Sequence, residues 1–370
     1  MGEALVFGAL RDFAQNFLGR GEATITVPSF DGALKPNQAL ERAETLFECA
    51  APEDLAADGG TVYLADGANL ARIEGNGVST IREFDQPITA LACLPGGGIA
   101  VALNGREVRV YLDAAAATPA ATFAGADMRS INALAAAADG ALYATDGSAR
   151  WDVEQWVWDL MERGRSGRAL RLDMKTKSIN VLAHDLRYAF GACAMDGSAL
   201  ISESWRHRLV SVAPNGASRV VLGNLPVYPS RLSPARGGGW WLTAFIARTQ
   251  LVEFVLREPA YRKRMMAEVD PEYWIAPRLS AGKSFKEPMQ GAHLKTMGVV
   301  KPWAPPRSYG LVIRLDAACT PTFSLHSRVD GTNHGIVSAI ESNGWLYLIA
   351  KGPGRVLRLP TEGLAKEFAA

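Results

Sequence analysis

Residues 131–151 read INALAAAADGALYATDGSARW: an alternating apolar segment, a turn that contains Asp139 and Gly140, and a second β-rich segment. Two short strands joined by a glycine-containing turn are typical of a β-hairpin. The same pattern returns as EDLAADGGTVYLADGANLARIE at 53–74 and as GACAMDGSALISESWRHRLVSVA at 191–213. We find six copies, whose turn glycines are Gly60, Gly98, Gly140, Gly197, Gly238 and Gly344.

Most of these glycines are separated by about 40 residues, the length of one four-stranded propeller blade. The repeat therefore predicts an all-β fold, a six-bladed β-propeller with helical insertions in blades three and five. The insertions are 151–167, whose apolar spacing predicts a short helix, and 257–307, expected to be a helix followed by irregular loop. Blade six has three strands of its own, and residues 42–50 supply a fourth that closes the ring.

This arrangement predicts one propeller domain over residues 42–362, preceded by an N-terminal helix or arm at 1–41. Within that arm, residues 3–18 place their apolar side chains near one helical face. Such a helix docks on the body of the protein or makes peripheral contact with a membrane surface.

Composition excludes several classes of protein. The 370 residues carry Lys+Arg 39 against Asp+Glu 38 and a net charge of +1, which argues against nucleic acid as a partner. The apolar segments are too short for a transmembrane helix, and no secretory signal pattern is present. The four cysteines form no CxxC pair and lie in apolar surroundings, so we expect free thiols and a cytoplasmic protein.

The repeat also predicts where a site would be. The innermost strand of every blade begins at one end of the central channel, so side chains at those positions converge there. The residues at this edge are Glu53, Thr89, Asn132, Phe190, Ser230, Arg231 and the stretch from Asn333 and His334 to Val337.

Each of these polar groups has a chemical and a structural interpretation. For Glu53 the chemical interpretations are a cation ligand and a general base with a raised pKa, and the structural one is a cap for turn amides. Asn132 is a metal ligand, a substrate contact or a turn residue. His334 is an acid/base partner for a carboxylate or an ordinary turn histidine. Arg231 neutralises an anionic substrate group at the pocket rim or is a surface arginine.

The chain resembles the strictosidine synthase-like family and, more distantly, the gluconolactonase and paraoxonase propellers. The most specific segments are PEDLA at 52–56, DGSARW at 146–151, GRSGRALRLD at 164–173, and NLPVYPSRLSPARGGGWWL at 224–242. The resemblance covers roughly residues 45 to 360. It implies a six-bladed propeller with its pocket on the central axis, and activities that include lactone or ester hydrolysis and amine–aldehyde condensation.

The departures from that family concern the site. Metal-dependent relatives place a Glu, two Asn and an Asp around a calcium or similar ion. By the resemblance, Glu53 and Asn132 keep two of those places, while Phe190 and Ser230 replace the second Asn and the Asp. Fewer oxygen ligands and less negative charge predict no catalytic metal. The glutamate used by the plant synthases is replaced by Val337.

These observations favour a metal-independent enzyme that acts on a small organic substrate, as a hydrolase or a lyase. Glu53 or His334 would transfer the proton, Asn132 and Arg231 would orient polar groups, and the site would include Thr89 and Ser230. Tyr188 and Phe190 would supply an apolar wall. One alternative is a non-catalytic propeller that binds a small molecule or a partner. Another is a calcium-dependent lactonase or esterase built on Glu53 and Asn132. A closed ring is expected to be a monomer or a weak dimer.

Overall fold

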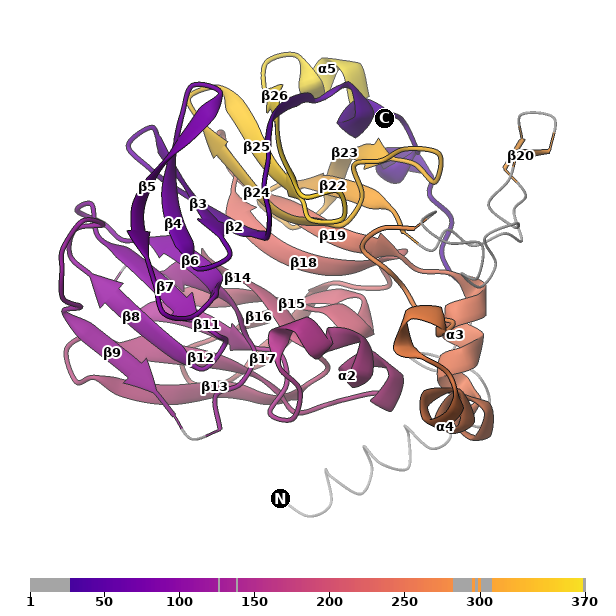
Figure 1. The fold of residues 1–370 in the computed structure, drawn as a ribbon, viewed down its shortest axis with the longest axis horizontal. Coiled ribbons are helices and arrows are strands. Elements are labelled where there is room, and N and C mark those ends of the chain that lie inside the picture. Colours follow the sequence, from indigo (N-terminus) through magenta and orange to yellow (C-terminus); the bar gives the residue numbers. More distant parts are fainter. Residues whose placement is uncertain are drawn as a thin grey trace.

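The computed structural model describes residues 27–125, 127–137, 139–281, 295–296, 299–300 and 308–368. It contains six four-stranded antiparallel sheets arranged as the blades of a propeller, which confirms the predicted fold class (Figure 1). The first three blades are β2 (Pro52–Asp58), β3 (Thr61–Asp66), β4 (Asn69–Glu74) and β5 (Gly77–Glu83); β6 (Ile88–Cys93), β7 (Ile99–Leu103), β8 (Glu107–Tyr111) and β9 (Ala121–Ala124); and β10 (Ile131–Ala136), β11 (Leu142–Asp146), β12 (Gly167–Asp173) and β13 (Ser178–Leu186).

The last three blades follow the same order. They are β14 (Ala189–Met195), β15 (Ser198–Glu203), β16 (Arg208–Val212) and β17 (Ser218–Leu222); β18 (Val227–Pro234), β19 (Trp240–Ala247), β22 (Gly310–Leu315) and β23 (Pro321–Ser327); and β24 (Ile336–Ser342), β25 (Trp345–Ala350), β26 (Arg355–Pro360) and β1 (Glu44–Glu48). A two-stranded sheet of β20 (Lys295–Thr296) and β21 (Val299–Val300) lies outside the blades.

The predicted repeat corresponds to the first hairpin of each blade, because all six repeat glycines lie between the first and second strands. The second strands β7, β11 and β19 are buried along their whole length. Neighbouring blades cover both faces of these strands, so the strands are mainly apolar rather than alternating, with Thr145, Asp146 and Thr243 as buried polar exceptions. The first strands β2, β6, β10, β14, β18 and β24 each contact the next and form a closed ring around the axis.

The ring is closed by the start of the described chain, as predicted. β1 pairs antiparallel with β26, and Glu44 lies opposite Arg358 in this ladder. Leu46 is the buried side chain of β1 and belongs to the same apolar cluster as Val356 of β26. The last blade is therefore built from both ends of the propeller sequence.

Both predicted insertions contain helices. The first forms the 3-10 turn Val153–Gln155 and α2 (Trp156–Glu162), between β11 and β12. The second begins earlier than expected, with α3 (Gln250–Arg257) and α4 (Pro259–Glu268) packed side by side at the edge of the ring (Figure 1). Part of its predicted irregular loop lies outside the described residues.

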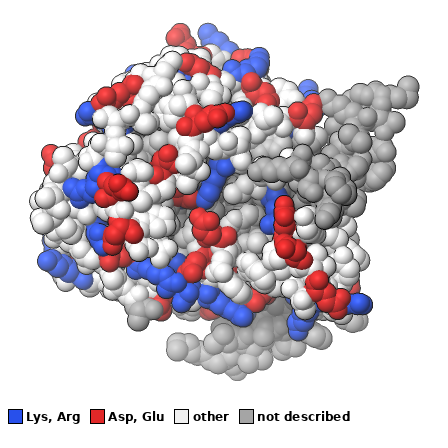
Figure 2. All heavy atoms as spheres, viewed as in Figure 1, with Lys and Arg blue, Asp and Glu red and all other residues white. Residues whose placement is uncertain are grey.

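The predicted N-terminal helix at 3–18 lies outside the described residues. The described part of the arm contains the 3-10 turns Gly32–Leu34 and Ala39–Arg42, which lie against β23. In the described part of the chain, no helix is long and apolar enough to cross a membrane. Positive and negative side chains are interspersed on the face shown in Figure 2.

Candidate functional site

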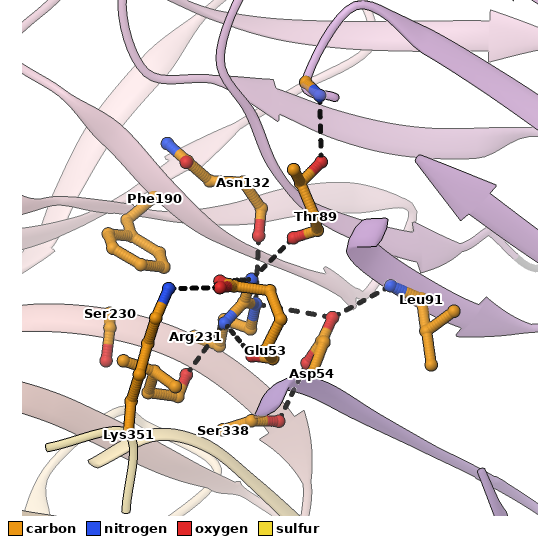
Figure 3. Close-up of polar contacts among 12 residues, drawn as sticks. Glu53, Asp54, Thr89, Leu91, Asn132, Phe190, Ser230, Arg231, Ser338 and Lys351 are labelled. Carbon is orange, nitrogen blue, oxygen red and sulfur yellow. Dashed lines mark hydrogen bonds and ion pairs between the residues drawn. The ribbon is translucent and has the colours of Figure 1, made fainter. Parts of the chain in front are cut away.

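The first strands of the blades bring most of the predicted residues to one point of the channel (Figure 3). Glu53 comes from β2, Thr89 from β6, Asn132 from β10, Phe190 from β14 and Arg231 from β18. All five are buried, with 7% or less of each residue exposed. The structure therefore brings together side chains from five blades that are far apart in the sequence.

Arg231 lies at the centre of this cluster rather than at the rim, where the sequence placed it as an anion-neutralising group. Its Nε donates to the carbonyl of Asn132 at 2.9 Å, and its Nη2 donates to the carbonyl of Thr89 at 2.7 Å. Its Nη1 donates to the carbonyls of Glu53 at 2.8 Å and Val337 at 3.3 Å. These four acceptors belong to four other blades.

The remaining blade contributes an aromatic ring. The guanidinium carbon of Arg231 lies 5.3 Å from the centroid of the Phe190 ring, which is within cation–π distance. Arg231 therefore contacts all five other blades through one planar group. Gly191 makes this close approach possible, because a Cβ at that position would collide with the backbone of Ser230 and Arg231.

Two carboxylates balance the charge of Arg231. Oε1 of Glu53 accepts from Nη2 at 3.0 Å, and Oδ2 of Asp54 lies 3.3 Å from Nε. Asp54 also accepts from the backbone N–H of Leu91 at 2.9 Å and from the Ser338 hydroxyl at 2.8 Å. Burial is nevertheless the larger effect and raises the pKa of Asp54.

Lys351 follows β25 and forms an ion pair with Oε2 of Glu53. Its side chain is 24% exposed against 9% for Glu53, so Lys351 marks the solvent side of the cluster. Burial alone would raise the pKa of Glu53, but Lys351 and Arg231 together hold it below its usual value. The raised pKa expected for Glu53 is thus reversed by two cations that the sequence did not reveal as its partners.

The other predicted residues have mainly backbone and packing contacts. Thr89 Oγ1 accepts from the N–H of Gly105 at 3.2 Å, and the Asn132 amide donates to the carbonyl of Ala189 at 3.0 Å. The Ser230 hydroxyl lies 2.7 Å from that of Thr243. The Asn132 carbonyl, and not its side chain, faces Arg231.

Tyr188 and Phe190, which were expected to form an apolar wall, both belong to a cluster of packed aromatic rings. Tyr188 stacks on Trp205 with ring centroids 4.5 Å apart, and Phe190 packs on Phe245 at 5.5 Å. The insertion helices extend this wall, because α2 contributes Trp156 against Phe245. The central cluster is therefore bounded on one side by aromatic rings from the blades and from the first insertion.

His334 makes its hydrogen bonds away from this cluster. Its Nδ1 lies 2.7 Å from the Ser308 hydroxyl, and its Nε2 lies 2.8 Å from the carbonyl of Arg328. Burial lowers its pKa, which favours the neutral ring. The structure thus places Glu53 in ion pairs with Arg231 and Lys351, and His334 in hydrogen bonds to the blade-five segment.

The sequence did not identify Asp54 or Lys351 as site residues. Asp54 was available in the PEDLA segment, as a second carboxylate next to Glu53. Lys351 directly follows Ala350, which pairs with Ile336 at the start of β24. The pairing of β24 with β25 therefore places the residue just after β25 next to the start of β24, at the channel end where Glu53 lies.

These residues do not fit a divalent cation on the channel axis. Such an ion needs about six to eight oxygen ligands, whereas the Glu53 carboxylate and four backbone carbonyls already bind a fixed positive charge. A second cation at this point would be repelled by the guanidinium of Arg231. Among the residues that the structure describes, no group of three or more His, Cys, Asp or Glu side chains could hold a metal ion.

Comparisons with known proteins agree with the fold and with the resemblance of the sequence. A strictosidine synthase family profile matches residues 132–211. Adipocyte plasma membrane-associated protein from Bos taurus is 29% identical over 278 residues, covering 64% of this chain and 65% of the relative. The match therefore spans slightly less than two thirds of that relative's length.

Solved structures show the same architecture. A gluconolactonase from Xanthomonas campestris superposes with a TM-score of 0.54 at 14% identity, covering 90% of this chain and 96% of that chain. Regucalcin from Agrobacterium tumefaciens, a calcium-binding protein, gives 0.52 at 12% identity, covering 86% and 92%. At such identities the likeness shows the fold alone. By its architecture the chain is a six-bladed β-propeller, and its sequence is similar to that of strictosidine synthase-like proteins.

Proposed function

We propose that this protein acts on a small organic substrate at the Glu53 end of the channel without a bound metal, most directly by hydrolysing an ester or a lactone. The observation that carries the proposal is the Glu53 carboxylate held between two cations, with Arg231 on one oxygen and Lys351 on the other. Such a carboxylate is ionised at neutral pH and fixed in orientation, as a general base must be.

The proposed roles follow from exposure and charge. Lys351 is the more exposed cation, so its ammonium can donate to a substrate carbonyl oxygen as negative charge develops there. Glu53 accepts a proton from water as the hydroxide attacks the carbonyl carbon. The bond between that carbon and the alkoxide oxygen then breaks, and the alkoxide takes the proton back from Glu53. Arg231 is buried and holds Glu53 in place. Phe190 provides an apolar surface beside the reacting group.

The test is a panel of p-nitrophenyl esters and of five- and six-membered lactones, assayed with the full chain in the presence of EDTA. We expect turnover that EDTA does not reduce. Glu53→Gln and Lys351→Met should each lower kcat by about 100-fold or more. Lys175→Met, in an exposed turn, is the matched control and should leave turnover unchanged.

A non-catalytic propeller that binds a small molecule is the second candidate. It is favoured by the engagement of both Glu53 oxygens and of both His334 ring nitrogens within the protein. Binding of panel compounds without turnover would support this candidate and contradict the first. Turnover that disappears with EDTA and returns with calcium would instead support a metal-dependent lactonase, in which Arg231 must leave the axis.

A further inference from the structure

Arg231 and Asp54 divide the central channel into two compartments. Glu53 and Lys351 lie on one side of this pair, as described above. On the other side, further along the first strands, is a cavity of about 230 Å³ that Asp54 and Arg231 themselves line. Glu53, Thr89 and Phe190 are not part of this lining. The cavity is therefore separate from the proposed reaction site.

The lining of this cavity is formed by small side chains. The first strands contribute Ala57, Ala92, Ala136 and Ala194, and the equivalent stretches of sequence read ALAC, NALAAAA and GACAM. An alanine leaves room that a larger apolar residue would fill. The walls are mainly apolar, so a ligand that removes them from water gains binding free energy in proportion to the area buried.

The charges at the inner end of the cavity are compensated within the protein. Asp54 accepts from two backbone N–H groups, from the Ser338 hydroxyl and from Arg231. Arg231 is bound by four backbone carbonyls and by Glu53. A charged ligand would lose its hydration without gaining an unpaired partner here. The cavity is thus suited to a neutral molecule.

One polar group in the lining is left without a partner. Ser233 of β18 is 7% exposed, and among the described residues its hydroxyl has no hydrogen-bond partner. The hydroxyl oxygen itself has less than 1 Å² of accessible surface, so it lies behind the cavity wall and is not available to a molecule in the cavity. Cys93 and Cys193 also line the cavity, but burial raises the pKa of both thiols to about 12, so they act as apolar wall.

We propose that this cavity is a second binding site, for a compact neutral molecule with an apolar ring. The size agrees with this class, because a cavity of about 150 Å³ in another protein accommodates benzene. Ala57, Cys93 and Ala136 at the cavity are only half-buried, which leaves the molecule a way in. The site does not depend on any chemistry at Glu53.

The experiment is calorimetric titration of the full chain with phenol, benzene and benzoate. We expect phenol and benzene to bind, and benzoate, which carries a charge, to bind least. Ala57→Leu and Ala136→Leu, two independent cavity-filling variants, should each weaken both phenol and benzene.

Two controls separate this site from the rest of the molecule. Ala115→Leu adds the same side chain at an exposed loop position and should leave phenol binding unchanged. Lys351→Met alters the proposed reaction site and should also leave it unchanged. The proposal is overturned if phenol fails to bind up to its solubility limit, or if both filling variants bind phenol like the wild type. It is equally overturned if Lys351→Met abolishes phenol binding, and none of these outcomes bears on turnover at Glu53.

Discussion

At the scale of single residues, Arg231 shows where local pattern and three-dimensional arrangement diverge. Its register correctly predicted a position at the channel end of an inner strand. The direction of its side chain depends on irregular pairing between β18 and β19, whose register shifts between Pro229 and Leu232. A β-bulge re-aims side chains and leaves little trace in a local sequence pattern. A rim arginine was therefore expected, whereas the guanidinium is on the axis.

The central position of Arg231 makes a strong prediction for stability. Arg231→Ala leaves Glu53 and Asp54 buried without their shared counter-charge, which should lower the free energy of unfolding by about 3–5 kcal/mol. Urea unfolding followed by tryptophan fluorescence measures the change. Millimolar methylguanidinium should restore part of the loss, because it supplies the missing planar cation.

The control is Arg264→Ala, which removes an exposed arginine that pairs with Glu268. Exposed ion pairs contribute little, so its unfolding free energy should change by less than about 1 kcal/mol. If Arg231→Ala proves as stable as this control, the guanidinium is not the central contact that its geometry indicates.

At the scale of elements, the insertion helices show which boundaries the sequence could give. The apolar spacing of residues 151–167 predicted a helix in the correct place, because that spacing changes clearly after β11. The second insertion was placed at 257, although α3 already begins at Gln250. Only the short polar stretch 248–249 separates β19 from α3, whose start is capped by the Thr249 hydroxyl, which accepts from the N–H of Val252 at 3.2 Å. The sequence also did not identify Lys351 as a site residue, because its approach to Glu53 depends on how blades six and one are placed relative to each other.

Glu253 on α3 anchors that helix to the propeller and makes a pH-dependent contribution. It accepts from Arg248 at 3.1 Å and from the Tyr228 hydroxyl at 3.2 Å, and it lies 3.4 Å from His207. Burial alone would raise its pKa, but His207 and Arg248 lower it to about 2 from the ordinary 4.5. The unfolded chain therefore holds the proton more tightly. The stabilisation is complete above pH 4.5 and is lost as pH falls toward 2.

We expect Glu253→Gln to lower the free energy of unfolding at neutral pH by up to about 3 kcal/mol. The difference from the wild type should shrink as pH falls below 4.5. Urea unfolding at a series of pH values measures this. Glu268→Gln, whose side chain is 57% exposed, is the matched control and should run parallel to the wild type. A constant difference between Glu253→Gln and the wild type at all pH values would contradict the ion-pair account.

At the scale of the whole molecule, the repeat and the closing strand were readable because a propeller uses the same local unit six times. What the sequence could not give is how the blades meet on the axis, since those contacts join residues up to 298 positions apart. The occupied axis leads to a prediction about metals. Thermal unfolding should shift by less than about 1 °C with EDTA or with millimolar calcium, because a ligand that binds the native state raises its stability. A rise in the unfolding temperature with calcium would show that enough oxygen ligands remain free of Arg231 to bind the ion.

Closure of the ring by β1 predicts how the molecule unfolds. Because β1 pairs with β26 and Leu46 packs in the cluster that includes Val356 and Leu55, the seam joins blade six to blade one. Leu46→Ala should lower stability by about 2–5 kcal/mol, the usual cost of truncating a buried leucine, and Thr45→Ala on the exposed side should cost far less. If the seam holds the whole ring, far-UV circular dichroism and tryptophan fluorescence will report one coincident transition at a lower temperature. An early separate transition would mean that blade six opens by itself. In that case β1 only covers the edge of blade six, and its loss does not destabilise the other blades.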